Sequence, residues 1–183
     1  MTTLVLCRHA DPERPDQRDA LAQALQATPL ATVYTSPLER ARATAAVVAH
    51  KHGLVPIAVD DLSEIDFGEL DGVEFDDFPE ELRQALLNEP TSVRFPGGEN
   101  YAELKERVGM AMEGIVAAHA HETVAVVTHG GVIRAALATW LQIPDEAVFR
   151  IDQRHASVNV VEWIDGVPIA RLVNGGPEKA PLG

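Results

Sequence analysis

The stretch LVLCRHA, from Leu4 to Ala10, joins an apolar run to an arginine and a histidine. A short, continuous apolar run of this kind is typical of a strand buried inside a sheet. Arg8 and His9 then stand at the carboxyl end of the strand, where open α/β sheets place their ligands. The stretch therefore predicts an α/β fold with a cationic, nucleophile-bearing site at this end of the sheet.

A second stretch has the same form. TVAVVTHGG, residues 123–131, is an apolar run that ends in His129 and two glycines. A single histidine at a strand end is most often a satisfied polar group, but two such ends in one chain favour a shared role. If the two strands lie side by side, they bring the imidazoles of His9 and His129 to one pocket. This pairing is the main indication of chemistry in the sequence.

A third segment, YTSPLERARATAAVV at residues 34–48, predicts a helix beside an anion site. Ser36 suits the N-cap position, and Glu39 three residues later completes a capping box. The helix macrodipole disfavours arginine near an N-terminus and favours an anion there, so one of the arginines is expected to hold an anion. Because residues two apart on a helix face different ways, we expect Arg40 to point inward and Arg42 outward.

Strands alternate with helices along the chain, which indicates a mostly parallel central sheet. An Asp-Gly pair at 165–166 between two apolar runs predicts an antiparallel hairpin at the sheet edge. The residues from about 174 to 183 are expected to form a flexible tail. The expected strands are 4–7, 32–35, 55–59, 123–128, 157–163 and 168–173, and the expected helices are 19–27, 37–52, 80–87, 101–120 and 131–141.

Composition favours one domain that acts on a small anion. The 183 residues are 46% hydrophobic without a break in composition, so a single domain over 1–183 is expected. The formal net charge of −13 argues against a nucleic-acid partner.

The single cysteine, Cys7, lies in an apolar strand and favours a reduced, cytoplasmic setting. No apolar run approaches about 20 residues, and the first strand leaves no space for a signal peptide, so no membrane association is expected.

Five motifs, taken in order, resemble branch 1 of the histidine phosphatase superfamily. They are CRHA, SPLERARATA, LSEIDFGELDG, FPGGEN and VVTHGG, and the resemblance runs from Leu4 to about Trp163. It implies the phosphoglycerate mutase-like fold, a three-layer α/β/α sandwich with a mostly parallel central sheet. It also implies a covalent phosphohistidine mechanism.

The resemblance implies a role for each matching residue. His9 is the nucleophile, Glu64 is the general acid and base, and the phosphoryl group is bound by Arg8, Arg40, His129 and Gly130. The physical chemistry agrees, because a phosphoryl group in transfer spreads negative charge over oxygens that guanidinium groups bind well. Nearby arginines also disfavour the protonated form of His9, which keeps its ring available for attack.

Other acids lie close to Glu64 in the sequence, and the pattern leaves them open as proton donors. Asp66, Glu69 and Asp71 are in the same acidic segment, and Glu99 in the PGGEN loop is a second-line candidate. Most of these carboxylates are expected to be solvated. The irregular segment 68–96, with its apolar residues at roughly helical spacing, is expected to cover the pocket as a lid. Those apolar residues are Phe75, Phe78, Leu82, Leu86 and Leu87.

Two loops depart from the family pattern. The first histidine is followed by Ala10, Asp11 and Pro12 where relatives have glycine and often a hydroxyl or amide side chain, so one contact to phosphate is expected to be missing. Arg14 either pairs with Asp11, replaces that contact or faces solvent. In the GGEN loop, Asn100 keeps the ability to cap the following helix.

The expected activity is hydrolysis of phosphomonoesters of small phosphorylated metabolites, without a metal or cofactor. The histidine pairs at 50/52 and 119/121 are two residues apart on expected helices and so face different directions, and His155 is expected to be an exposed loop residue. Two alternatives remain: a phosphoglycerate mutase-type phosphotransferase, and a non-catalytic phosphate-binding module. The short chain lacks the insertions of the mutases and has few spare lysines, which favours the phosphatase.

Overall fold

A six-stranded mixed sheet forms the centre of the fold, and the computed structural model describes residues 1–73 and 75–179 of the chain. Its strands are β1 Thr2–Arg8, β2 Leu30–Thr35, β3 Ile57–Ala58, β4 Thr123–Thr128, β5 Val158–Ile164 and β6 Val167–Gly175. Across the sheet the order is β3-β2-β4-β1-β5-β6. The first four are parallel neighbours, and β5 and β6 are antiparallel. The expected mostly parallel sheet with an antiparallel edge hairpin is therefore confirmed.

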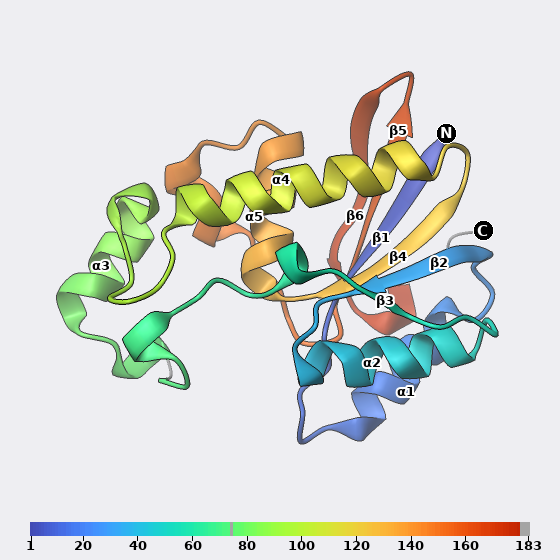
Figure 1. The fold of residues 1–183 in the computed structure, drawn as a ribbon, viewed down its shortest axis with the longest axis horizontal. Helices are drawn as coiled ribbons and strands as arrows, with labels where there is room; N and C mark the ends of the chain where they lie inside the picture. Colours follow the sequence, from blue (N-terminus) through green and yellow to red (C-terminus); the bar gives the residue numbers. More distant parts are fainter. Residues whose placement is uncertain (74, 180–183) are drawn as a thin grey trace.

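Helices cover both faces of the sheet, which makes the expected three-layer sandwich (Figure 1). The helices are α1 Pro15–Leu25, α2 Glu39–His50, α3 Glu80–Asn88, α4 Tyr101–Ala118 and α5 Gly130–Trp140. α4 and α5 pack on one face, and α1 and α2 pack on the other. α4 begins with the expected cap, because the Asn100 side chain accepts from the Glu103 backbone N–H and the Glu103 side chain accepts from that of Asn100.

Strand β1 shows why its sequence is continuously apolar. Side chains alternate between the two faces of a strand, and helices bury both faces here. Leu4 and Leu6 belong to the core under α4 and α5, whereas Val5 and Cys7 belong to the core under α1 and α2. Burial raises the pKa of the Cys7 thiol to about 12, so the thiol stays protonated and serves as packing.

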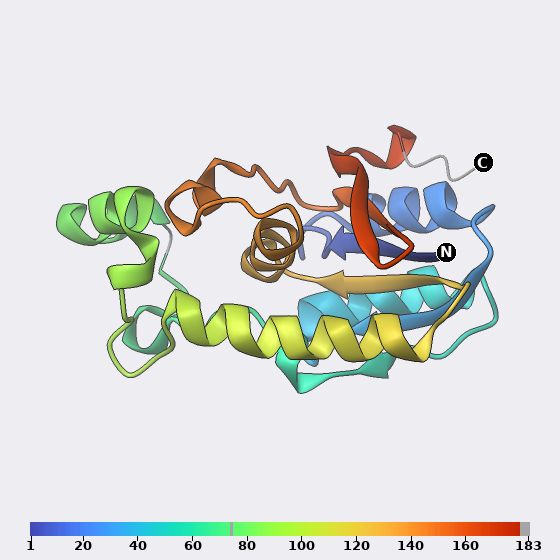
Figure 2. The same cartoon turned by 90° about the horizontal axis from the view of Figure 1, so that it is seen from above.

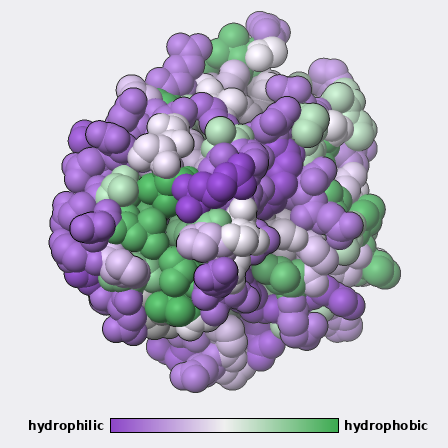
Figure 3. Space-filling view, turned by 60° about the vertical axis from the view of Figure 1, so that its left-hand side comes forward, coloured by the Kyte–Doolittle hydropathy of each residue, from purple (hydrophilic) through white to green (hydrophobic). Residues whose placement is uncertain are grey.

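The segment between β3 and α4 forms a lobe with its own small core. Phe78, Leu86, Val93 and Phe95 are buried there, and Phe67 packs its ring edge-on against Phe95 at 5.0 Å. Figures 1 and 2 both place α3 beyond the ends toward which β1 and β4 point. Figure 3, which turns this end forward, shows hydrophobic side chains gathered in one area with hydrophilic ones around it. The lobe thus lies at the end of the sheet where the expected lid belongs, although the Phe75 side chain falls outside the described part.

Several expected boundaries are wrong. The first helix begins at Pro15 rather than at 19, since proline suits the first turn of a helix. β3 has only two residues, both exposed, because it lies at the edge of the sheet. β6 extends to Gly175 and a 3₁₀ turn spans Pro177–Lys179, so 174–179 have regular structure, while 180–183 lie outside the described residues. No helix in the described ranges combines the length and apolar content needed to cross a membrane.

Candidate active site

The two histidine-bearing strand ends lie next to each other. Arg8 of β1 pairs in register with Thr128 of β4, and the His9 backbone N–H donates to the Thr128 carbonyl at 2.9 Å. The rings of His9 and His129 are therefore close, with centroids 5.1 Å apart. The expectation that parallel pairing would bring both imidazoles together is confirmed.

His9 presents one ring nitrogen as a base. Its Nδ1 lies 2.8 Å from the Ala10 carbonyl oxygen, which can only accept, so Nδ1 carries the proton and Nε2 keeps its lone pair. The pKa of His9 is lowered to about 4, mainly by burial and also by the positive charges of Arg8 and Arg40, while the hydrogen bond to Ala10 opposes the shift. The ring is therefore neutral at pH 7 and has a nucleophilic nitrogen.

Arg8 is fixed from the far side of the site by the segment that precedes β5. Its Nη1 donates to the Gln153 carbonyl, and its Nη2 lies 3.0 Å from His155 Nε2. The His155 ring is also 5.2 Å from that of His9. The expectation that His155 is an exposed loop residue is wrong, because the turn at residues 154–157 folds it back against β1.

His129 is completely buried and in contact with Ser36. Its Nε2 lies 2.7 Å from the Ser36 hydroxyl oxygen. Burial lowers the pKa of His129, and the nearby charges of His9, Arg40 and Arg8 add to this effect, so the ring is neutral. The expected capping box at Ser36 is wrong: α2 begins at Glu39 with Leu38 at its N-cap, and Ser36 Oγ accepts from the Leu38 N–H instead of from a backbone N–H of the helix.

Two buried nitrogens at the site lack hydrogen-bond partners within the described structure. They are Arg8 Nε and His129 Nδ1. An unpartnered buried donor is costly, by about 1–3 kcal/mol. Both belong to residues that adjoin His9, one through the chain and one through its ring, so a polar ligand at His9 is suited to pair with them.

Arg40 acts on the site from the first turn of α2. Both Arg40 and Arg42 are exposed, so burial does not separate them. The charge of Arg40 nevertheless lowers the pKa of His9, His129 and Arg8. The helix is tied to the loop after β1 by Thr44, whose hydroxyl accepts from the Ala10 N–H and donates to the Arg40 carbonyl.

Glu64 lies at the N-terminus of α5. Its carboxylate accepts from the Ile65 N–H at 2.9 Å and from the Gly131 N–H at 3.2 Å. A Cβ atom at Gly131 would overlap Glu64 Oε1, so only glycine permits this approach. At Gly130, an added Cβ would lie 3.2 Å from Arg134 Nη1, closer than an ordinary contact, and 3.7 Å from Arg8 Cζ. The glycine pair after His129 thus lets a carboxylate and a guanidinium group come close to the helix end.

The other acids of this region have different positions. Asp66 accepts from the Gly68 N–H, and Glu69 and Asp71 are exposed. Glu99 forms a two-pronged ion pair with Arg107. Among the candidates for proton donor, only Glu64 affects the pKa of Arg8, which its negative charge raises.

The structure of the loop after His9 shows which partners Asp11 and Arg14 have. Arg14 pairs with Asp16 and not with Asp11. Asp11 Oδ1 instead accepts from the Glu13 backbone N–H at 3.0 Å. Arg14 is exposed, so it faces solvent and does not replace a phosphate contact.

Arg134 is a residue of the site that the sequence motifs did not single out. Its Nε donates to the Ile151 carbonyl at 2.8 Å, and its guanidinium group lies over the Phe149 ring at 5.9 Å. Burial lowers the pKa of Arg134, whereas the charge of Glu64 raises it. The sequence feature that indicates Arg134 is its spacing, because a residue four positions after Gly130 lies on the same face of a helix.

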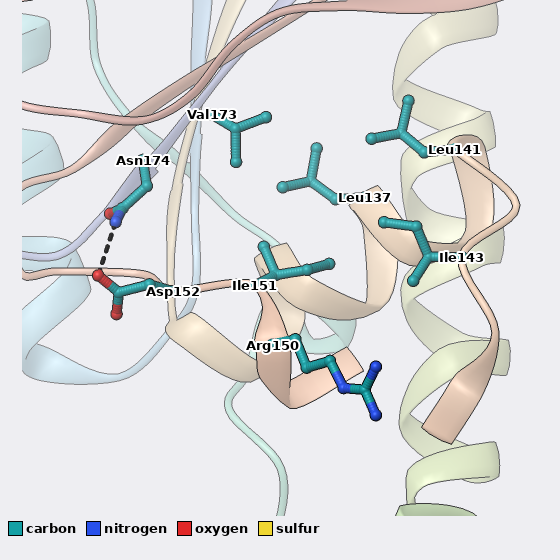
Figure 4. Close-up of a pocket in the computed structure, with 8 residues that line it drawn as sticks. All are labelled: Leu137, Leu141, Ile143, Arg150, Ile151, Asp152, Val173 and Asn174. Carbon is teal, nitrogen blue, oxygen red and sulfur yellow. Dashed lines mark hydrogen bonds between the residues drawn. The ribbon is translucent and has the colours of Figure 1, made fainter. Parts of the chain in front are cut away.

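A separate pocket of about 310 Å³ lies behind the segment that holds Arg8 (Figure 4). Its lining is mostly apolar, and Asp152 in its wall accepts from Asn174 at 2.8 Å. It has no nucleophile, so the chemistry belongs to the histidine site. The described ranges contain no group of three or more histidine, cysteine, aspartate or glutamate residues placed to hold a metal ion.

Fold and site together define an α/β protein with two neighbouring histidines and an arginine at the carboxyl end of parallel strands. The family model of the histidine phosphatase superfamily (branch 1) matches residues 5–175. The chain belongs to this superfamily.

Sequence relatives include phosphatases. Phosphoserine phosphatase 1 of Hydrogenobacter thermophilus is 31% identical over 183 residues, which cover 88% of this chain and 86% of the relative. A bifunctional protein of Mycobacterium tuberculosis is 34% identical over 149 residues, 79% of this chain. The match spans only 41% of that longer protein.

Solved structures share the fold over almost the whole chain. YhfR of Bacillus stearothermophilus has a TM-score of 0.86 at 25% identity and covers 96% of this chain and 98% of its own. A phosphoserine phosphatase of Entamoeba histolytica, solved with 3-phosphoglyceric acid, has a TM-score of 0.86 at 19% identity over the same shares. The phosphoglycerate mutase-like α/β fold is therefore confirmed.

Proposed function

We propose that this protein is a phosphatase that hydrolyses small phosphorylated metabolites through a phosphohistidine on His9. The observation that carries the proposal is the state of His9: neutral, with Nδ1–H held by the Ala10 carbonyl and Nε2 free beside two arginines. The relatives named as phosphatases support the reaction class.

The first half-reaction transfers the phosphoryl group to the enzyme. The lone pair of His9 Nε2 forms the bond to phosphorus as the bond from phosphorus to the leaving oxygen breaks. Glu64, protonated at this stage, gives its proton to that oxygen. Arg8 and Arg40 bind the charge that develops on the phosphoryl oxygens, and His129 donates from its buried ring N–H.

The second half-reaction returns the enzyme to its initial state. Glu64, now a carboxylate, takes a proton from water, and the water oxygen bonds to phosphorus as the P–N bond breaks. Inorganic phosphate leaves, and His9 is again neutral. A mutase would instead pass the phosphoryl group to a second hydroxyl and release no inorganic phosphate. A phosphatase releases one phosphate for each alcohol formed, so measuring both products distinguishes the two activities.

We propose that the lobe shapes the leaving-group side of the site. It adjoins the site through Ile65, the neighbour of Glu64, and through Phe149, which contacts Arg134. Its hydrophobic surface suits an organic leaving group (Figure 3).

Replacing Glu64 by glutamine tests the acid role through the leaving group. We expect kcat/KM for phenyl phosphate to fall by about 10²-fold, while that for 4-nitrophenyl phosphate, whose leaving group needs no proton, changes by less than about threefold. Steady-state kinetics on both substrates measure this. Glu69→Gln, in the same acidic segment but exposed, is the matched control and is expected to act as wild type. Equal slowing on both substrates would move the role to another acid.

The pH profile tests the state of His9. Because only the neutral ring attacks and its pKa is lowered to about 4, kcat/KM for 4-nitrophenyl phosphate is expected to fall only as the pH drops through about 4. Arg40→Gln removes a positive charge near the ring, so this acid limb should move to higher pH. Rates at pH 3–8, corrected for ionisation of the substrate, locate the limb. A limb near 6.5 in the wild type would contradict the proposed nucleophile.

A further inference from the structure

A partly buried ion pair outside the phosphate site joins α4 to the PGGEN loop, next to the loop that bears Glu64. Arg107 Nε donates to Glu99 Oε1 at 2.7 Å, and Nη2 donates to Oε2 at 2.8 Å. Only 19% and 13% of the two side chains are exposed. A two-pronged pair of this kind is among the strongest and most directional polar contacts in proteins.

The same guanidinium group binds the backbone on the way to Glu64. Its Nη1 donates to the carbonyls of Asp61 and Ser63 at 2.8 and 2.9 Å, and Nη2 donates to the carbonyl of Glu64 itself at 3.1 Å. All three guanidinium nitrogens of Arg107 therefore donate hydrogen bonds, and three of these bonds go to carbonyls of the loop at residues 61–64.

Glu99 holds the chain on the other side of Glu64. Its Oε2 accepts from the Asp66 N–H at 3.2 Å, and its own N–H donates to the Asp66 carbonyl at 2.9 Å. The close approach of these loops needs glycine, because a Cβ atom at Gly98 would overlap the Asp66 carbonyl. The backbone is thus clamped both before and after the candidate acid.

We propose that Arg107 and Glu99 are positioning residues for the Glu64 carboxylate, an inference that rests on the proposed acid role of Glu64. Within the described part of the chain, the carboxylate itself accepts hydrogen bonds only from the N–H groups of Ile65 and Gly131. Its place relative to the leaving oxygen therefore depends on where the loop backbone lies. A misplacement of about 1 Å costs on the order of 10²-fold in rate.

The test is Arg107→Lys, which keeps the charge but loses the planar fork that makes five contacts. We expect kcat/KM for phenyl phosphate to fall by about tenfold, within the range for misplacement of a catalytic group. For 4-nitrophenyl phosphate we expect less than about a twofold change, since the leaving group needs no acid. In the Glu64→Gln background, Arg107→Lys should cause no further loss on phenyl phosphate, because the group it positions is already gone.

Controls separate positioning from general destabilisation. Arg94→Lys alters another arginine that bonds both the PGGEN loop and α4, but not the Glu64 loop, and should leave both substrates unaffected. If Arg107→Lys does not fold, Glu99→Gln replaces it with the same expected pattern. Equal loss on both substrates, or full loss retained in the Glu64→Gln background, overturns the positioning role. If Glu64→Gln itself lacks leaving-group selectivity, the acid assignment fails and the positioning role falls with it.

Discussion

Replacing His9 by alanine is expected to reduce kcat for 4-nitrophenyl phosphate by about 10⁴-fold or more, the scale seen when a nucleophile is removed. Without His9 Nε2 we expect no phosphoenzyme, because the other histidines near Arg8 have their ring nitrogens engaged or buried. His155 Nε2 accepts from Arg8 Nη2 at 3.0 Å, since a guanidinium group can only donate. His129 is fully buried against Ser36 and cannot take its place. Steady-state assays measure the loss of turnover. Denaturing the protein during turnover and detecting a phosphohistidine, whose P–N bond is labile to acid and stable to alkali, measures the loss of the phosphoenzyme.

The matched control is His50→Ala, at the exposed end of α2, which should keep wild-type turnover. Since His9 is 5% exposed, its removal also leaves a space next to β1. Added imidazole should fill it and restore part of the turnover, which shows that the fold is intact. Near-normal activity of His9→Ala without imidazole would refute the nucleophile assignment.

The sheet and the histidine pair were predictable because burial leaves a strong signature. Both faces of β1 are covered, so Leu4 to Cys7 form an unbroken apolar run, and β4 repeats the pattern from Val124 to Val127. Parallel neighbours necessarily bring their carboxyl ends to one edge. The positions of His9 and His129 follow from this rule alone.

The surroundings of the histidine pair were not predictable, because they depend on contacts between distant segments. A serine before a helix suits an N-cap equally well whether or not it meets a histidine 93 positions later, as Ser36 does. His155 reaches Arg8 only because Ala156 takes a left-handed backbone conformation, with a φ of 55°. Nothing in the residue types around 155 requires such a turn.

Glu99 was singled out by the sequence, but its partner could not be predicted. A carboxylate in a Gly-rich loop near an anion site is a reasonable candidate acid from its sequence. Its actual partner, Arg107, is eight residues away and on the same side of α4 as the Glu64 loop. The pattern located a carboxylate beside the Glu64 loop but could not show that it pairs with an arginine of α4.

Arg8→Lys is expected to lower kcat/KM for any phosphomonoester by about 10²–10³-fold, the cost of losing a preorganised donor to a developing anion. Arg8 is oriented by the Gln153 carbonyl and His155, and within the described residues its buried Nε has no partner, which leaves this donor for a ligand. A lysine keeps the charge but has neither the Nε–H donor nor the planar group that the Gln153 carbonyl and His155 orient.

The loss at Arg8 should be the same for good and poor leaving groups, unlike that of Glu64→Gln, because the phosphoryl oxygens carry charge whatever group departs. Inhibition by vanadate, which mimics the pentacoordinate phosphorus of the transition state, should weaken in parallel with kcat/KM. Arg154→Lys changes a neighbouring exposed arginine that bonds Asn174, and it should leave both quantities unaltered. If Arg8→Lys lowers kcat/KM by less than about threefold, the fork does not bind the phosphoryl group, and Arg40 and Arg134 must supply that stabilisation instead.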